Sequence, residues 1–283
     1  MSSVSNGDAQ QEIDAGERFA FGANWAAFLS LMSQDRIETA QQAITQLLGT
    51  ESLTGKSFLD IGSGSGLSSL AVHQLGARVT SFDFDRQSVG CTTELRRRYA
   101  PDSARWEIRQ GSVLDSSFMS SLGLFDIVYS WGVLHHTGQM WPAIHQASQR
   151  VAAGGQLFIA IYNDEGLGSR FWKRVKQTYC SGALQRALMK AIFIPYFALQ
   201  YAAKTIITGR SPKVATRTRG MSVYYDWIDW LGGYPFEVAK VEELLHFCQA
   251  RGFTLENLTT TNRLGCNQLV FRRTGDCPVS LNS

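Results

Sequence analysis

Short apolar runs alternate with helix-patterned stretches between residues 56 and 162, and this alternation restricts the fold more than any other feature of the sequence. We predict buried strands over 57–61, 78–82, 105–109, 125–130 and 156–162, the last of them after a turn at Gly154-Gly155. Helices are predicted over 66–75, 87–99 and 140–151. Such alternation builds an α/β fold, a parallel sheet with helices on both faces. Right-handed crossovers then bring the loops after the strands to one edge, where ligands bind.

The regions on either side of this alternation extend the same domain. Residues 8–50 are mostly helical in pattern, with apolar residues at helical spacing from 37 to 48 and Gly49 as a stop signal. Near the other end, a helix over 241–250 precedes strands over 253–261 and 266–273, which we expect to form an antiparallel edge hairpin. We therefore divide the chain into a helical cap (1–54), a core (55–164), an insertion (165–237) and a terminal helix with edge strands (238–283).

Composition excludes several classes of protein. With 44% hydrophobic and 18% charged residues, the chain is neither wholly disordered, collagen-like nor a multi-span membrane protein. The five cysteines are scattered without a CxxC pair, so neither a disulfide framework nor a zinc site is expected, and we expect no bound metal. The first residues lack a basic and apolar secretory signal. These features favour a reducing cytoplasm as the location.

The predicted strand over 57–61 runs directly into three alternating glycines, Gly62, Gly64 and Gly66. Bare backbone at such a turn lets a ligand approach the N–H groups closely. A dinucleotide site would need a further glycine where Leu67 stands, and a pyrophosphate gains nothing from Asp60. A cofactor with a positive amine and a sulfonium does gain from that carboxylate. Asp83 suits the ribose in either case, and a turn without any ligand is the third reading.

These residues resemble the class I S-adenosyl-L-methionine (SAM)-dependent methyltransferases, and more narrowly the UbiG/UbiE-like small-molecule branch. Matching blocks lie at 59–66, 79–83, 110–115, 126–136 and 151–156, in the order of the family's motifs. The resemblance implies a Rossmann-like, seven-stranded, mostly parallel sheet, with SAM as cofactor. The cofactor contacts that it implies are Asp60, Gly62, Ser63, Gly64, Gly66, Asp83, Phe84, Ser112, Val113 and Trp131.

Residues after the fourth and fifth strands are candidates for handling the methyl acceptor. His135 and His136 are titratable groups at the ligand-binding edge, where an imidazole could take a proton near neutral pH. The alternative is that either histidine packs against the end of the sheet. Tyr162 and Asn163 reach the same edge and could orient an acceptor, although Asn163 could equally cap the next helix.

The insertion over 165–237 should cover the open edge of the sheet as a helical lid. From Glu165 to Gly220 it has eleven Lys or Arg and a single acid, a net charge of +10, around an apolar run at 191–199 that Pro195 interrupts. Three alternatives remain open for 183–208: a helical pair with solvated cations, contact with an anionic membrane surface, or the surface of a partner subunit, as in a homodimer.

The second half of the insertion is rich in aromatic residues. Tyr224, Tyr225 and Trp227 could wall a pocket for a small organic acceptor, and Asp226 could accept a proton or grip the substrate. Arg219 would suit a carboxylate or phosphate on that substrate. An aromatic core without ligand is the competing interpretation.

The sequence thus predicts a SAM-dependent methyltransferase that modifies an O or N atom of a small biosynthetic metabolite. An anionic metabolite would suit Arg219. Methylation of a quinone-type lipid at a membrane surface is the alternative acceptor class, and an NAD(P)-dependent oxidoreductase is the alternative activity. The net charge of +3 and the lack of an RNA-binding motif argue against a nucleic-acid partner.

Overall fold

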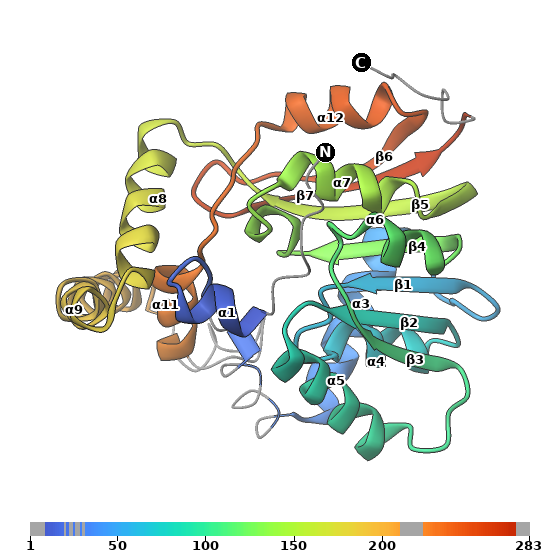
Figure 1. The fold of residues 1–283 in the computed structure, drawn as a ribbon, viewed down its shortest axis with the longest axis horizontal. Helices are drawn as coiled ribbons and strands as arrows, with labels where there is room; N and C mark the ends of the chain where they lie inside the picture. The colour runs from blue at the N-terminus through green and yellow to red at the C-terminus, as the bar shows by residue number, and fades with distance from the viewer. Residues whose placement is uncertain are drawn as a thin grey trace.

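The computed structural model describes residues 9–19, 21–22, 25, 29, 32–209 and 223–275, with the backbone alone at 9, 10, 204, 208, 223–226 and 229. A seven-stranded sheet lies between two layers of helices (Figure 1). The strands are β1 (Ser57–Ile61), β2 (Arg78–Asp83), β3 (Trp106–Gln110), β4 (Phe125–Trp131), β5 (Val151–Tyr162), β6 (Phe253–Thr259) and β7 (Cys266–Arg273).

The strand order is β3-β2-β1-β4-β5-β7-β6. All neighbours are parallel except β7, which is antiparallel to both β5 and β6. The expected α/β sheet with an antiparallel hairpin at its edge is therefore confirmed. The chain order reverses direction between β1 and β4, which makes the carboxyl ends of these two strands the switch point where ligands bind in open α/β sheets.

Alternation of side chains along β1 sends neighbouring residues to opposite helical layers. Leu59 and Ile61 pack with one layer and Phe58 with the other, and all three are fully buried. The first layer consists of α6 (Ser116–Ser121), α7 (Met140–Ser148) and α12 (Val241–Gln249). The second consists of α3 (Gln34–Leu48), α4 (Leu67–Gln74) and α5 (Arg86–Tyr99).

Glycines decide two of the element boundaries. Gly49 ends α3 in the left-handed region at φ 65°, as the sequence predicts. The predicted turn at Gly154-Gly155 is wrong, because β5 begins at Val151 and continues through both glycines. Gly154 has φ 70°, and the pairing of β5 with β4 shifts register between Phe125 and Ile127. The two glycines thus form an irregularity inside a longer strand.

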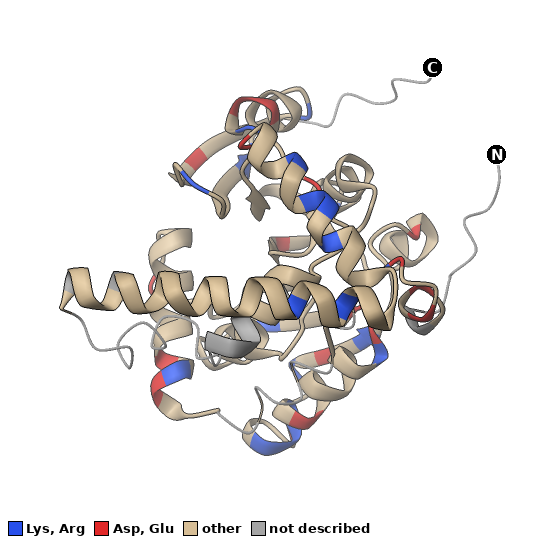
Figure 2. Cartoon of the chain, turned by 90° about the vertical axis from the view of Figure 1, so that its left-hand side faces the viewer, with Lys and Arg blue, Asp and Glu red and all other residues tan. Residues whose placement is uncertain are grey.

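The insertion folds beside the carboxyl edge of the sheet. It contains α8 (Leu167–Cys180), α9 (Ala183–Thr208) and α11 (Val223–Gly232), while α1 (Ala9–Asp14) lies near α11 (Figure 1). The three helices share a hydrophobic cluster that includes Trp172, Phe193 and Leu231. The expected break at Pro195 is not observed, since α9 is continuous through it. Figure 2 shows α9 as a long helix across the face that it occupies.

Candidate active site

The glycine loop after β1 is closely packed. Gly62, Gly64 and Gly66 have φ values of 77°, 54° and 83°, which L side chains rarely adopt. A Cβ on Gly62 would lie 2.5 Å from the Val133 side chain, and one on Gly66 would lie 3.0 Å from Thr92. Packing against Val133 and Thr92 therefore requires glycine at these two positions, and the glycine loop adjoins the loop after β4.

Asp83 at the end of β2 holds the glycine loop in place. One carboxylate oxygen accepts from the Gly64 amide and the other from the Asp85 amide, both at 2.9 Å. Desolvation raises the pKa of Asp83 to about 6, although these two hydrogen bonds oppose the shift. A carboxylate offers about four acceptor sites, so two backbone bonds leave capacity for ribose hydroxyls. The geometry fits the role expected of this acid.

Asp60 is buried on the α4 side of β1, with 2% exposure. It accepts a hydrogen bond from the Ser69 hydroxyl at 2.5 Å, and Ser69 lies 2.6 Å from Ser81. Burial raises the pKa of Asp60 to about 7, the Ser69 hydrogen bond opposes this, and Asp83 adds to it by charge repulsion. A cation nearby would favour the ionised form. A cationic cofactor and Asp60 are therefore electrostatically matched.

The remaining candidates for cofactor contact surround this loop. Ser63 is buried and its hydroxyl lies 2.9 Å from that of Thr92. The Ser112 hydroxyl accepts from the Leu114 amide at 3.2 Å, and Val113 is buried beside it. Trp131 ends β4, half-buried. All of them stand at or just beyond the carboxyl ends of strands.

Residues near the N-terminus also reach the glycine loop, although the sequence predicts no site role for them. The Arg18 guanidinium lies over the Phe84 ring at 4.9 Å and donates to the His136 carbonyl at 3.1 Å. The Gly22 amide donates to Asp85 at 2.9 Å. A Cβ on Gly64 would lie 2.9 Å from the Trp25 ring. These residues come from a region predicted as helix. Gly22 and Trp25 lie in the block 21–25, which resembles uncharacterised members of the UbiG/UbiE-like branch, but no site role was predicted from that block.

The two histidines lie in the short helix η1 (Leu134–His136) after β4. His136 donates from Nδ1 to the Pro235 carbonyl at 2.6 Å, and burial lowers its pKa to about 3. Burial also lowers the pKa of His135 well below its usual value, and its ring nitrogens have no hydrogen-bond partner of good geometry in the described structure. The imidazoles are therefore neutral near pH 7, unlike the titrating groups that the sequence predicts.

Tyr162, the last residue of β5, packs against both histidines. Its ring centroid is 4.1 Å from that of His135 and 5.6 Å from that of His136. Trp230 and Phe236 close the cluster, at 5.7 Å and 5.1 Å from Tyr162. The result is a mostly aromatic group beside the glycine loop, which we refer to below as the histidine–tyrosine cluster (His135, His136, Tyr162, Trp230 and Phe236).

A buried lysine from α8 borders this cluster. Lys176 has no exposed surface, its Nζ lies 4.2 Å from the Trp230 ring centroid and 5.0 Å from that of Phe236, and it donates to the Trp230 carbonyl. Its charge lowers the pKa of both histidines, after the larger effect of burial on each. The α8 sequence reads as an ordinary basic amphipathic helix, so nothing in it singled out this lysine.

Two predicted acceptor-site residues lie elsewhere. Trp227 packs toward α9, 6.0 Å from Phe197 and 6.2 Å from Tyr201, so Trp230 is the residue of the aromatic block that contacts Tyr162. Asn163 is bonded to main chain and side chains around β7: its amide donates to Gly265 at 2.8 Å and its side chain accepts from Asn267 at 3.0 Å. It does not cap α8 either, because that helix begins after Gly166.

Four predicted residues cannot be placed. Arg219 lies outside the described residues, and for Tyr224, Tyr225 and Asp226 the structure describes the backbone alone, in α11.

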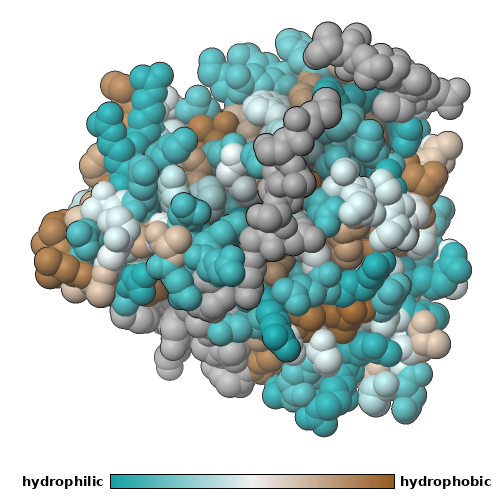
Figure 3. All heavy atoms as spheres, in the orientation of Figure 1, coloured by the Kyte–Doolittle hydropathy of each residue, from teal (hydrophilic) through white to brown (hydrophobic). Residues whose placement is uncertain are grey.

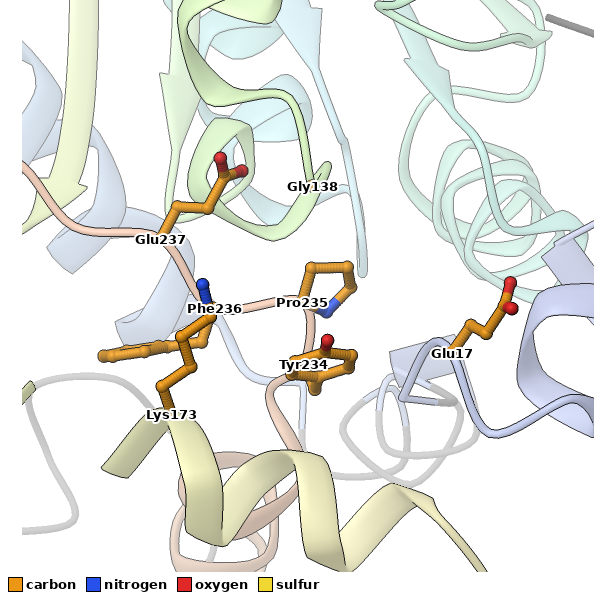
Figure 4. Close-up of a pocket in the computed structure, with 7 residues that line it drawn as sticks. All are labelled: Glu17, Gly138, Lys173, Tyr234, Pro235, Phe236 and Glu237. Carbon is orange, nitrogen blue, oxygen red and sulfur yellow. The ribbon is translucent and has the colours of Figure 1, made fainter. Parts of the chain in front are cut away.

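A cavity of about 340 Å³ is lined in part by the segment 234–237, whose Pro235 carbonyl contacts His136 (Figure 4). Lys173 extends from α8 toward Phe236 and Glu237, and Tyr234 and Pro235 form the wall between them and Glu17. Glu237 accepts from the Met140 amide at the start of α7, at 3.0 Å from its nearer oxygen. Both signs of charge therefore line the cavity.

Two further observations concern bound metal and membranes. No group of three or more His, Cys, Asp or Glu side chains in the described ranges is arranged to hold a metal ion. No helix in that same part of the chain is long and apolar enough to cross a bilayer.

Comparison with known proteins finds methyltransferases. Residues 59–157 match the family model described as a methyltransferase domain. The ubiquinone biosynthesis O-methyltransferase of Idiomarina loihiensis is 29% identical over 114 residues, which cover 40% of this chain and 45% of that protein. The corresponding enzyme of Azotobacter vinelandii is 30% identical over 111 residues, 39% of this chain and 46% of its own length. The chain thus spans less than half the length of these curated relatives.

Solved structures show the same fold. Magnesium protoporphyrin IX methyltransferase from Synechocystis PCC 6803, with bound SAM, superposes with a TM-score of 0.56 at 12% identity, over 96% of this chain and 100% of that one. An O-methyltransferase family protein from Burkholderia thailandensis gives 0.54 at 13% identity, over 94% and 63%. Residues 59–157 thus match the methyltransferase domain family, and the chain has the fold of a SAM-bound methyltransferase of known structure.

Proposed function

We propose that this protein transfers the methyl group of SAM to an O or N atom of a small organic acceptor held at the histidine–tyrosine cluster. One observation carries the proposal: the Val133 side chain lies against Gly62, so the glycine loop adjoins the loop that carries His135 and His136. A methyl donor on the first loop and an acceptor on the second would be neighbours, as in-line transfer requires.

In this proposal Gly62, Gly64 and Gly66 offer bare backbone to the cofactor, Asp83 accepts from its ribose, and Asp60 favours its positive charge. Phe84, Ser63, Ser112, Val113 and Trp131 are proposed to line the rest of the cofactor site. When bound, SAM supplies an electrophilic methyl carbon on a sulfonium. The chain's own contribution is then to place the acceptor atom in line with that carbon and to exclude water.

His136 is proposed to orient the acceptor. Because its Nδ1 donates to the Pro235 carbonyl, the neutral ring presents Nε2 as a hydrogen-bond acceptor. A pKa of about 3 makes this nitrogen a weak base, so accepting a hydrogen bond from a hydroxyl or amine suits it better than full proton removal. Asp226 stays a candidate for the proton acceptor, with Tyr224, Tyr225 and Arg219 as candidate substrate contacts.

A quinone-type lipid is the alternative acceptor. The names of the curated relatives, ubiquinone biosynthesis O-methyltransferases, favour it, although the matches stop short of half their length. The aromatic walls Tyr162, Trp230 and Phe236 suit a ring of either kind of acceptor. Radiolabelled SAM with a bacterial lipid extract and with a soluble metabolite extract would separate the two, by the fraction in which the label appears.

The cofactor assignment can be tested first and separately. We expect calorimetry to show binding of SAM and S-adenosylhomocysteine and none of NAD⁺ or NADP⁺. Asp83→Ala should weaken binding strongly, and Asp102→Ala, in an exposed turn, should leave it unchanged. Uptake of a dinucleotide without SAM would instead support the oxidoreductase alternative, and wild-type affinity in Asp83→Ala would refute the ribose role.

A further inference from the structure

The outward face of α9 is hydrophobic and exposed. Leu184, Leu188, Ile192, Leu199 and Ile206 are 78%, 53%, 50%, 72% and 82% exposed. Figure 3 shows hydrophobic atoms gathered at the extreme left of the molecule, where Figure 1 places α9. Large apolar side chains gathered at this exposure indicate an interaction surface rather than a stable solvent face.

These five residues form one stripe. At about 100° per residue, they fall within an arc of about 80° along a helix about 39 Å long. Ala191, Pro195 and Ala202 lie in or beside the same arc and are exposed too. The opposite side of α9 is occupied by its own protein, since Phe193 and Phe197 pack on Trp172 of α8 at 5.4 Å and 6.0 Å. The stripe is thus the free side of a helix held on its other side.

The neighbouring helix extends this surface. On α8, Leu167 is 79% exposed and Phe171 is 53% exposed, and the Phe171 ring lies 6.4 Å from that of Phe193. Arg170 and Arg174 are also exposed and, at helical spacing, flank Leu167 and Phe171. Figure 2 shows basic residues along α8 and, on α9, towards one end of the helix. The exposed apolar residues of α8 therefore have arginines beside them.

Charge decides between the possible occupants of the stripe. The sequence from 166 to 225 contains eleven Lys or Arg and no Asp or Glu. A second copy on this face would bring two such segments together, and like charges across an interface oppose association. A bilayer with anionic headgroups matches both properties of the surface. Cations need not touch the lipid, because attraction acts over a Debye length of about 10 Å.

We propose that α9 binds in the plane of an anionic phospholipid bilayer, with the stripe from Leu184 to Ile206 inserted at the boundary between headgroups and acyl chains and with the cations of α8 near the phosphates. In-plane binding is the geometry of an amphipathic helix whose other face is polar or covered. This proposal goes beyond methyl transfer and does not depend on it.

Vesicle co-sedimentation of the full chain tests the proposal. We expect binding to vesicles of phosphatidylglycerol and phosphatidylcholine, much weaker binding to phosphatidylcholine alone, and loss of binding as salt rises. Leu199→Glu should weaken binding at least tenfold by placing a charge in the stripe. Leu124→Glu is the matched control: Leu124 is 59% exposed, lies before β4, and should bind like the wild type.

Several results would overturn the proposal. Wild-type protein that stays in the supernatant with anionic vesicles refutes it, and so does equal binding by Leu199→Glu. A lipid-free dimer in sedimentation velocity that Leu199→Glu dissociates would assign the stripe to a second copy. Circular dichroism and calorimetry with S-adenosylhomocysteine on each variant report folding and cofactor binding separately, and Leu199→Gln gives a milder variant if the glutamate disturbs the helix.

Discussion

His136 donates from Nδ1 to the carbonyl oxygen of Pro235 at 2.6 Å, a bond that joins the loop after β4 to the segment after α11. The Glu237 amide donates to the His135 carbonyl at 3.0 Å and strengthens the same connection. The insertion is therefore attached to the carboxyl edge of the sheet through its last residues. A change at His136 should consequently alter both stability and activity.

His136→Ala leaves the Pro235 carbonyl without its donor, so we expect a loss of about 1–3 kcal/mol in the free energy of unfolding, measured by denaturant titration. His136→Asn can keep this bond, because the asparagine amide can occupy the place of Nδ1. It lacks the Nε2 acceptor. We therefore expect near-wild-type stability and a large loss of kcat in His136→Asn. Full activity in that variant would show that the imidazole only positions the loop.

Asp60 should make cofactor binding depend on pH. With a pKa of about 7 in the protein, roughly nine-tenths of the Asp60 carboxyl is protonated at pH 6. A positive cofactor favours the ionised acid, so affinity for SAM should fall by up to about tenfold from pH 8 to pH 6. Calorimetry at the two pH values measures this. Asp60→Asn should bind more weakly at pH 8 and show a smaller pH dependence, although Asp83 titrates nearby and retains part of it.

The same carboxyl should affect stability in the opposite direction. Its pKa in the folded protein exceeds the unfolded value, so the folded state binds more protons between about pH 4 and pH 7. The contribution of Asp60 to stability is then full at low pH and is lost as the pH rises through about 7. Asp60→Asn should be more stable than the wild type at pH 8, and equal or lower stability there would contradict the burial assigned to this acid.

The strands and helices could be predicted where the local sequence pattern is distinctive. Strands such as 57–61 were correctly predicted because a short, mostly apolar run stands directly before a glycine loop, and β7 because a short turn separates two short strands. The irregularity of β5 at Gly154 was not predicted, because a pair of glycines indicates a turn as readily as a bulge. Pro195 interrupts the apolar run in the sequence, yet α9 continues through it, with Pro195 on the exposed side of the helix.

The placement of the candidate site residues was predictable where one local unit of the chain sets it, and not where distant segments meet. Gly62 to Gly66 and Asp83 lie within one βαβ unit, whose geometry is set locally. Arg18, Lys176 and Trp230 reach the site only through tertiary packing of the N-terminal region and the insertion. Trp227 and Trp230 are three residues apart on α11, and only the packing of that helix decides which one contacts Tyr162.

Gly62→Ala tests the close approach of the two loops. The new methyl would lie 2.5 Å from Val133 at φ 77°, so we expect strain and displacement together to cost about 1–3 kcal/mol and to abolish measurable cofactor binding. Gly123→Ala is a matched control, since its φ of 81° is similar and nothing lies within 4 Å of the added Cβ. It should lose some stability and keep its affinity. Equal binding by both variants would argue against the loop as the cofactor cradle.

Arg18→Ala tests whether the N-terminal residues complete the cofactor site. The guanidinium covers the Phe84 ring, bonds to the His136 carbonyl and pairs with Glu12, so its removal should weaken SAM binding by about 1–2 kcal/mol, roughly five- to thirtyfold. Arg97→Ala removes an exposed ion pair with Glu94 on α5 and should change neither affinity nor kcat. Calorimetry with S-adenosylhomocysteine measures both variants. Because Arg18 also lowers the pKa of Asp83, the loss in Arg18→Ala should grow as the pH falls toward 6, whereas a pH-independent loss would mean that the arginine acts through packing on Phe84 alone.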